Sequence, residues 1–209
     1  GVKFRIWKLK FSGYWDVYRF PRIDYADVKN GVDYRVEISF RVSRNVDFRV
    51  IAREKSTVEG VKTLDDFGRT IWGEGIEWRR NGRVEVENRF GKVAFKSRVE
   101  MVRRDLNRVE KGFLVYQGVR YQVFNSLRLY GRIVFFKTDS YWSRIYVYED
   151  DIDGVVSLIP FYGDGLRWYF VLKYKFGKSF SVQMKYGETF LSAGEIVKNI
   201  FGVQIEVKI

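Results

Sequence analysis

The sequence contains no cysteine and no histidine, and only two prolines occur among its 209 residues. Disulfides, thiolate nucleophiles and histidine-based catalytic triads are therefore excluded, as are zinc sites built from the usual ligands. No apolar run approaches the roughly 18 residues that a transmembrane helix needs. Asparagine and glutamine are scarce while Lys, Arg and Glu are abundant, which is typical of a source that grows at high temperature.

The chain is instead rich in aromatic residues, at 18%, and strongly basic, with a formal net charge of +12. Its 46% of hydrophobic residues excludes low-complexity disorder. The positive excess indicates anionic partners such as phosphate groups or anionic solutes. No linker rich in Pro, Gly or Ser divides the chain, so we expect a single domain over residues 1–209.

Hydrophobic residues recur with period two, which is the signature of β-strands. From Val32 to Ser43 every even position is apolar and every odd position is polar or charged. From Leu166 to Phe176 an apolar and aromatic face alternates with one that carries Arg and Lys. Similar runs follow at 180–186 and 203–209. No long segment has helical periodicity, so the pattern predicts an all-β protein.

Turn signals separate these runs. The pairs Asn81-Gly82, Gly91-Lys92 and Gly177-Lys178 are typical of two-residue hairpins. Counting runs between turns predicts about twelve strands, with ten to fourteen compatible with the pattern. Val203–Ile209 ends the chain as a closing strand would.

Alternation alone leaves two architectures open: a soluble sandwich that buries its apolar face, or an outer-membrane barrel that turns it to lipid. The runs at 32–43 and 166–176 have the length needed to cross a bilayer at a tilt, about 9–11 residues. Their opposite faces carry mixed charges that must meet water or pair internally. We therefore predict an all-β, antiparallel up-and-down transmembrane β-barrel. Its expected membrane-interface aromatics are Trp168, Tyr174, Phe176 and Tyr186.

Two segments resemble outer-membrane proteins of the Bacteroidetes type that are often labelled as helix-hairpin-helix proteins. Residues 139–150 read DSYWSRIYVYED and residues 159–169 read IPFYGDGLRWY. In that family a similar pair of segments precedes two strands like those at 170–176 and 180–186. The resemblance covers about residues 110–190 and implies an outer-membrane barrel without a characterised activity. A helix-hairpin-helix segment is absent from this sequence, so DNA handling does not carry over.

Charged residues on the polar faces form the candidate site. Arg144, Glu149, Asp150 and Arg167, the charged members of the resembling segments, would either set ion preference or form a salt-bridge network that fixes the wall and plugs the interior, which we favour. The inward-facing basic residues would favour anions in a barrel. The candidate cluster is Arg35, Glu37, Arg41, Arg144, Glu149, Asp150, Arg167, Lys173, Lys175 and Lys185.

The acidic run at 149–154 could bind Ca²⁺, but it lacks the spacing of a calcium-binding loop, and a solvated turn is the better interpretation. We expect no metal and no cofactor. No catalytic spacing stands out, so we also expect no enzymatic activity.

The predicted function is a passive pore or structural component of the bacterial outer membrane, with a net-basic lumen that favours anions if it is open. The expected partners are outer-membrane lipids or lipopolysaccharide, and small solutes or anions. No specific nucleic acid is expected. The alternative is a soluble, basic all-β protein that binds nucleic acid or another polyanion through cations and stacking rings.

Overall fold

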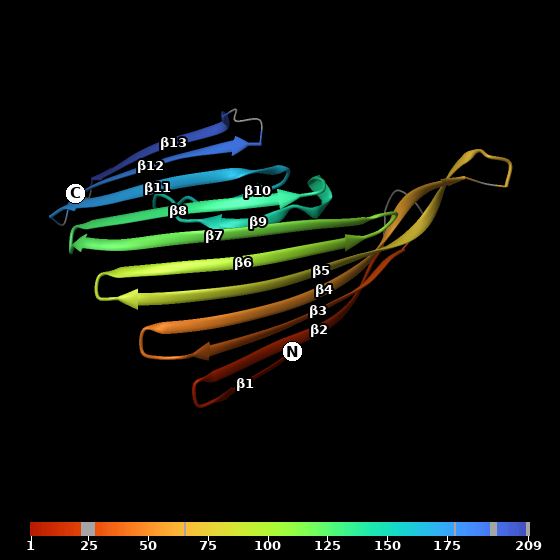
Figure 1. The fold of residues 1–209 in the computed structure, drawn as a ribbon, viewed down its shortest axis with the longest axis horizontal. Coiled ribbons are helices and arrows are strands. Elements are labelled where there is room, and N and C mark those ends of the chain that lie inside the picture. The colour runs from red at the N-terminus through yellow and green to blue at the C-terminus, as the bar shows by residue number, and fades with distance from the viewer. Residues whose placement is uncertain (22–27, 65, 178, 193–195, 208–209) are drawn as a thin grey trace.

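The computed structural model describes residues 1–21, 28–64, 66–177, 179–192 and 196–207. Eleven strands form one antiparallel sheet in the order β1-β2-β3-β4-β5-β6-β7-β8-β11-β12-β13, and a separate two-stranded hairpin is formed by β9 and β10 (Figure 1). The predicted antiparallel all-β class is confirmed. No helix within these ranges is long and apolar enough to span a membrane.

The strands vary in length from five residues to twenty-one. They are β1 (Val2–Ile6), β2 (Leu9–Pro21), β3 (Val28–Arg41), β4 (Val46–Leu64), β5 (Thr70–Phe90), β6 (Val93–Asp105), β7 (Val109–Phe124), β8 (Leu127–Thr138), β9 (Ile145–Glu149), β10 (Ser157–Phe161), β11 (Asp164–Phe176), β12 (Phe180–Leu191) and β13 (Ile196–Val207). A short 3₁₀ helix, η1 (Tyr141–Ser143), precedes β9.

The register divides the residues of the large sheet between two faces. We call the face against which the β9–β10 hairpin packs the inner face, and the opposite one the outer face. One row of directly paired residues on the outer face is apolar throughout: Phe11, Ile38, Val50, Val84, Val99, Val115, Phe135 and Leu166. The adjacent row on the inner face is largely charged or polar: Lys10, Ser39, Arg49, Glu85, Arg98, Tyr116, Val134 and Arg167.

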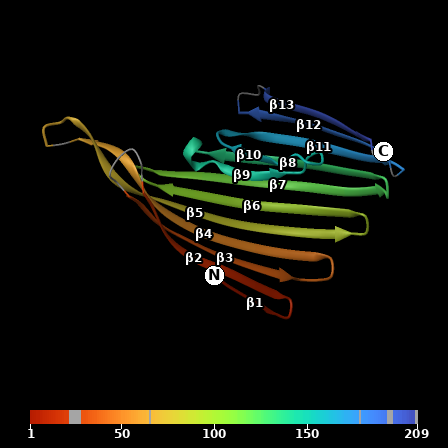
Figure 2. The ribbon, with the colours of Figure 1, turned by 180° about the vertical axis from the view of Figure 1, so that it is seen from behind.

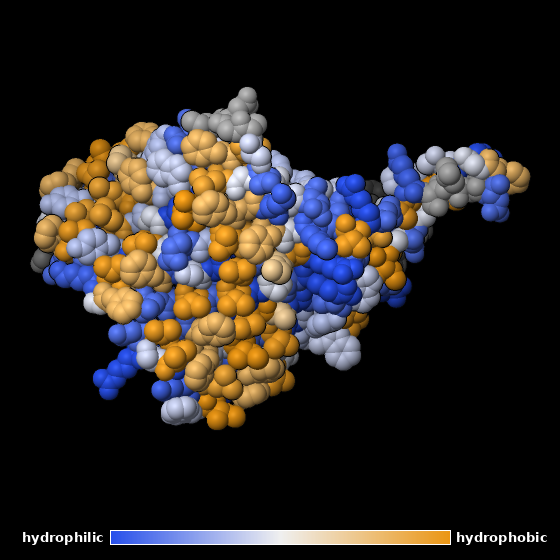
Figure 3. Space-filling view, in the orientation of Figure 1, coloured by the Kyte–Doolittle hydropathy of each residue, from blue (hydrophilic) through white to orange (hydrophobic). Residues whose placement is uncertain are grey.

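Apolar side chains on the outer face are not covered by other parts of the chain. Ile38 is 40% exposed, Phe135 is 47% exposed and Met101 is 59% exposed. Orange, hydrophobic residues spread over much of the face in Figure 3, with blue residues where the β4–β5 hairpin leaves the body. A water-soluble monomer rarely leaves so large a contiguous apolar surface exposed, whereas a lipid-facing wall requires one.

The connections differ at the two ends of the strands. At one end the turns between β3 and β4, β5 and β6, and β7 and β8 contain two to four residues. At the other end the β4–β5 hairpin extends beyond its neighbours (Figures 1 and 2). Its residues 58–64 and 70–76 pair only with each other. The β6–β7 turn at this end is also short, residues 106–108, so the asymmetry rests on the β4–β5 extension and the long β8–β11 connection, residues 139–163. Outer-membrane barrels likewise have short turns on the periplasmic side and long loops outside.

One predicted turn is wrong. Asn81 and Gly82 lie in the middle of β5, where Asn81 pairs with Arg53 on one side and Val102 on the other. Backbone pairing with two neighbouring strands therefore overrides the local turn preference of this dipeptide. The predicted turn at 91–92 is present, and another two-residue turn at 125–126 joins β7 to β8. In the predicted turn Gly177-Lys178, Lys178 is outside the described residues.

The predicted closure by Val203–Ile209 is also not found. β13 pairs with β12 alone, and within the described residues no backbone pairing joins it to β1. The first and last of the eleven alternating strands run in the same direction, so joining them would need a parallel pairing in place of the antiparallel closure that was predicted. These two strands cannot complete an all-antiparallel ring.

Candidate functional site: an inner hairpin and its cationic socket

The β9–β10 hairpin packs on the inner face through an apolar base, above β7, β8 and β11 (Figures 1 and 2). Ile145 and Val147 of β9 and Phe161 of β10 are each at most 2% exposed. The ring of Phe161 lies 5.0 Å from that of Phe136, centroid to centroid. The sheet residues of the same cluster are Val102, Leu114, Tyr116, Val134 and Phe136. Burial of this cluster fixes the hairpin against the wall, because each such side chain contributes about 1.5–3 kcal/mol.

The chain enters the hairpin through η1. Ser140 caps this short helix, with its Oγ accepting a hydrogen bond from the backbone N–H of Trp142 at 3.0 Å. Below it, a Cβ on Gly112 would collide with the carbonyl oxygen of Ser143. The absence of a side chain at position 112 therefore allows the hairpin to begin close to the sheet.

Beyond the apolar base, Glu149 forms a buried ion cluster with the wall. Both of its oxygens accept hydrogen bonds from Arg167 of β11, at 2.6 and 3.0 Å. Lys185 of β12 lies 3.1 Å from Glu149. All three side chains are at most 2% exposed. A carboxylate at this depth is stable only because two cations and a bidentate geometry compensate its lost hydration.

The next residue, Asp150, is held by β7, β8 and β11. Its carboxylate lies 2.7 Å from Arg120 and 3.3 Å from Arg132. The hydroxyl of Tyr169 accepts a hydrogen bond from the Asp150 backbone N–H at 3.0 Å. Arg132 also donates to the carbonyl oxygen of Tyr148 at 2.6 Å. The strand end is thus fixed through both backbone and side chain.

The acidic turn continues this arrangement. Asp151 lies 2.6 Å from Lys185, and Asp153 lies 2.7 Å from Lys173. The predicted solvated turn is therefore wrong at Glu149 and Asp151, whose side chains are 0% and 7% exposed, because wall cations draw these carboxylates inward. Within the described ranges no group of three or more acidic residues is arranged to hold a metal ion.

These contacts lower the pKa of the turn carboxylates. Burial acts to raise the pKa of Asp151, but hydrogen bonds from Lys185 and Ser157 outweigh it, and the pKa lies below its ordinary value of 3.8. The hydrogen bond from Lys173 likewise lowers the pKa of Asp153 below 3.8, against a smaller opposing effect of burial. Both groups are ionised at neutral pH and remain attached to their cations.

The two segments that carry the family resemblance meet at this site. Residues 139–150 supply η1, β9 and the acidic pair, and residues 159–169 supply the end of β10 and the strand that anchors it. Glu149 of the first bonds to Arg167 of the second, and Asp150 bonds to Tyr169. Together the segments therefore encode most of the hairpin and one cation, Arg167, of its socket. We define the socket as the wall cations that bind the hairpin's acidic residues: Arg120, Arg132, Arg167, Lys173 and Lys185.

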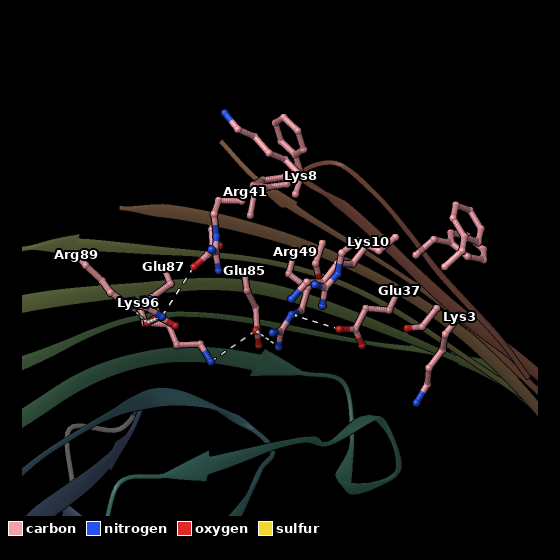
Figure 4. Close-up of a pocket in the computed structure, with 18 residues that line it drawn as sticks. Lys3, Lys8, Lys10, Glu37, Arg41, Arg49, Glu85, Glu87, Arg89 and Lys96 are labelled. Carbon is pink, nitrogen blue, oxygen red and sulfur yellow. Dashed lines mark hydrogen bonds and ion pairs between the residues drawn. The ribbon is translucent and has the colours of Figure 1, made fainter. Parts of the chain in front are cut away.

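The remaining inner face, over β1 to β6, forms an open basic hollow of about 610 Å³ (Figure 4). Eight Lys or Arg and four Asp or Glu line it, a net charge of +4. Arg49 bridges Glu37 at 3.3 Å and Glu85 at 3.5 Å. Within the described residues, Lys3 and Lys10 have no acidic partner in an ion pair. This hollow retains uncompensated positive charge.

The predicted charge cluster is thus divided between two places. Glu149, Asp150, Arg167, Lys173 and Lys185 meet in the socket. Arg35, Glu37 and Arg41 lie on β3, where Arg35 pairs with Glu37 at 2.6 Å and Arg41 with Asp47 at 3.0 Å.

Two further residues of the predicted cluster lie outside both places. Arg144 lies at the hairpin's entrance and bonds to the hydroxyl of Tyr146 at 2.6 Å. Lys175 lies on β11 beside Ser181 of β12. Neither is brought into contact with the Glu149 cluster.

The four predicted interface aromatics lie on the outer face. The rings of Trp168 and Tyr186 are 5.6 Å apart, and those of Tyr174 and Phe176 are 4.2 Å apart. Their depth in a membrane stays a prediction.

Sequence reasoning missed several residues that join the hairpin to the wall, namely Arg120, Arg132, Asp151, Asp153 and Tyr169. For Asp151 and Asp153, one available signal was the length of the two strands that flank them. Strands β9 and β10 have five residues each, which is too short to cross a bilayer.

Comparison with solved structures places this architecture among bacterial outer-membrane β-barrels. The chain is similar to the outer-membrane expressed OmpT of Vibrio cholerae, with a TM-score of 0.59 and 12% identity over 98% of this chain and 62% of that one. It is also similar to the ferric-catecholate import receptor Fiu of E. coli K12, with a TM-score of 0.56 and 10% identity over 87% of this chain and 38% of that one. At such identities the likeness shows the fold.

The chain spans less than two thirds of the length of either protein. No family model and no curated protein matches it. The chain has the fold of an outer-membrane β-barrel protein, and its described strands form an open sheet.

Proposed function

We propose that this protein works in the bacterial outer membrane as a passive, anion-preferring pore that the β9–β10 hairpin narrows from one side. The observation that carries the proposal is the division of the inner face. The hairpin and its ion pairs cover the part over β6 to β12, while the hollow over β1 to β6 keeps a net charge of +4. A wet passage beside this surface would concentrate anions.

The outer face supports the location. Its exposed apolar rows fit a lipid environment and weigh against the soluble, polyanion-binding alternative. The resemblance to Bacteroidetes-type outer-membrane proteins belongs to the same proposal, because its two segments supply most of the hairpin and Arg167, which binds Glu149. Transport would involve no chemical step, so the proposal includes no enzymatic activity.

Reversal potential in a planar bilayer under a KCl gradient tests the proposal. We expect the protein to pass chloride in preference to potassium. Replacing Lys3→Glu together with Lys10→Glu in the hollow should shift the reversal potential toward cation preference. Arg103→Glu, on the outer face, is the matched control and should leave it unchanged.

Cation preference of the unmodified protein, or an unchanged potential in the Lys3→Glu, Lys10→Glu variant, would contradict an anion pathway along this surface. Insertion without any conductance would contradict the pore and favour a structural role in the membrane.

A further inference from the structure

The outer face carries a second hollow, of about 760 Å³, that the pore proposal does not use. Its centre lies where small residues are paired across neighbouring strands. Ala52 of β4 pairs with Gly82 of β5, and Gly82 pairs with Met101 of β6. A Cβ placed on Gly82 would meet nothing within 4 Å. The wall is therefore indented at this point, between larger apolar side chains.

Val36 and Phe113 flank this indentation in the same cross-strand row. Met101 is 59% exposed, so the thioether side chain stands at the edge of the hollow. The size of the hollow is within the range of small-ligand sites, about 300–1,000 Å³. Its apolar floor has the chemistry that accommodates a hydrocarbon chain.

A row of cations borders the hollow at the end of the strands from which the β4–β5 hairpin extends. Arg80, Arg103 and Lys111 are paired side by side across β5, β6 and β7. Lys137 of β8 lies beside Phe113, at the same border. Five Lys or Arg and two Asp or Glu line the hollow as a whole, but the side chain of one of them, Arg53, pairs with Asp33 on the inner face. Positive charge is thus gathered at one end of an apolar surface.

Some of these cations keep capacity for a ligand. Arg80 pairs with both Glu54 and Asp105, and Arg103 pairs with the same Asp105. The two distances to Asp105 are 3.0 Å each, and both arginines remain about half exposed. Lys137 pairs with Asp164 through side chains that are 74% and 52% exposed. Lys111 has no acidic partner in an ion pair within the described residues, and its backbone N–H is held by Asp139 at 2.8 Å. Exposed pairs of this kind exchange readily for a phosphate group.

The end of the strands at which the cations lie decides between possible ligands. They lie on the side of the long connections, which in outer-membrane barrels is the side of the outer leaflet. We propose that this hollow is a binding site for lipopolysaccharide, whose phosphorylated sugar headgroup would contact Arg80, Arg103, Lys111 and Lys137 while an acyl chain covers Ala52 and Gly82. The inference rests on the proposed outer-membrane location, but it is independent of conductance.

Binding of bisphosphorylated lipid A to the detergent-solubilised protein, followed by native mass spectrometry, tests the site. We expect the Arg103→Glu, Lys111→Glu variant to weaken binding at least tenfold, by repelling the phosphates. Gly82→Phe should weaken binding similarly by filling the hollow. Lys10→Glu, on the inner face, is the control and should bind as the unmodified protein does.

The lipid probes separate the possible sources of phosphate. Dephosphorylated lipid A and phosphatidylglycerol should each bind at least tenfold more weakly than lipid A. Equal binding of phosphatidylglycerol would overturn the assignment to lipopolysaccharide. Unchanged lipid A binding in both the Arg103→Glu, Lys111→Glu variant and Gly82→Phe would overturn the site. A dimer that covers this face in detergent would also overturn it. Lipid binding can be absent while anion conductance is intact, and conductance can be absent while lipid binding is intact. The experiments therefore distinguish failure of the lipopolysaccharide site from failure of the pore.

Discussion

Glu149 and Arg167 form a buried, bidentate ion pair that joins the tip of β9 to the wall strand β11, with N–O distances of 2.6 and 3.0 Å. Neither side chain is more than 1% exposed. Lys185 stands 3.1 Å away and links the same carboxylate to β12. This pair ties the inner hairpin to β11, which is separated from the basic hollow over β1 to β6 by β7 and β8.

Removing one partner of this pair should be costly. Glu149→Gln leaves Arg167 and Lys185 without their shared carboxylate, and we expect the free energy of unfolding to fall by about 3–5 kcal/mol. In a double-mutant cycle, Glu149→Gln with Arg167→Gln should cost less than the sum of the two single variants. Urea unfolding in detergent measures both.

The control is the exposed pair formed by Arg41 and Asp47, whose side chains are 56% and 36% exposed. Asp47→Asn should change stability by less than about 1 kcal/mol. Additive effects at Glu149 and Arg167 would show that the two residues do not act as a unit.

The apolar base of the hairpin gives a second prediction. Phe161 is 2% exposed and packs against Phe136, so Phe161→Ala should destabilise the protein by about 3–5 kcal/mol. Leu158→Ala on the same strand is the control, because Leu158 is 43% exposed, and we expect a smaller loss. The measurement is the same urea titration. Equal losses would mean that the hairpin is not held through its Phe161 face.

The attachment of the acidic turn should depend on pH only in the acid range. The pKa values of Asp151 and Asp153 lie below 3.8 in the folded protein. Their ionised forms therefore add stability above the unfolded value, and that stability is lost as the pH falls through the lower folded values. Backbone hydrogen exchange in residues 145–161, corrected for intrinsic rates, should show unchanged protection from about pH 7 to pH 5 and loss only as the pH falls below 3.8, the ordinary pKa of these groups.

Asp153→Asn, which removes one titrating group and its bond to Lys173, should already reduce protection at neutral pH. Loss of protection in the unmodified protein between pH 7 and pH 5 would contradict the ion-pair account of the turn.

The alternation of apolar and polar residues made the strands of the large sheet and their two faces predictable from the sequence. Ile38 and Ser39 could be assigned to opposite faces from the sequence, because side chains in a strand alternate regardless of what lies beyond each face. The same rule explains why the position of the β9–β10 hairpin on the inner face could not be predicted from the sequence. In β9 the buried Ile145 and Val147 alternate with Tyr146 and Tyr148, and this pattern does not say whether a strand belongs to the wall or lies inside it.

The ion pairs between the hairpin and the wall could not be predicted from the sequence for a different reason. Glu149 and Lys185 are 36 positions apart, and only the fold of the hairpin over β11 and β12 brings them within 3.1 Å. Asn81 shows the reverse case, where a strong local turn signal yields to pairing with both β4 and β6.

We expect the outer face to contact lipid and the open inner face to contact water. Because the chain has no cysteine, single-cysteine variants carry no background reactivity. Ile38→Cys and Ser39→Cys are neighbours on opposite faces, and a membrane-impermeant maleimide should be applied to each in proteoliposomes. We expect Ser39→Cys to be labelled and Ile38→Cys to react only after unfolding. Equal labelling of both in the intact membrane would contradict the account.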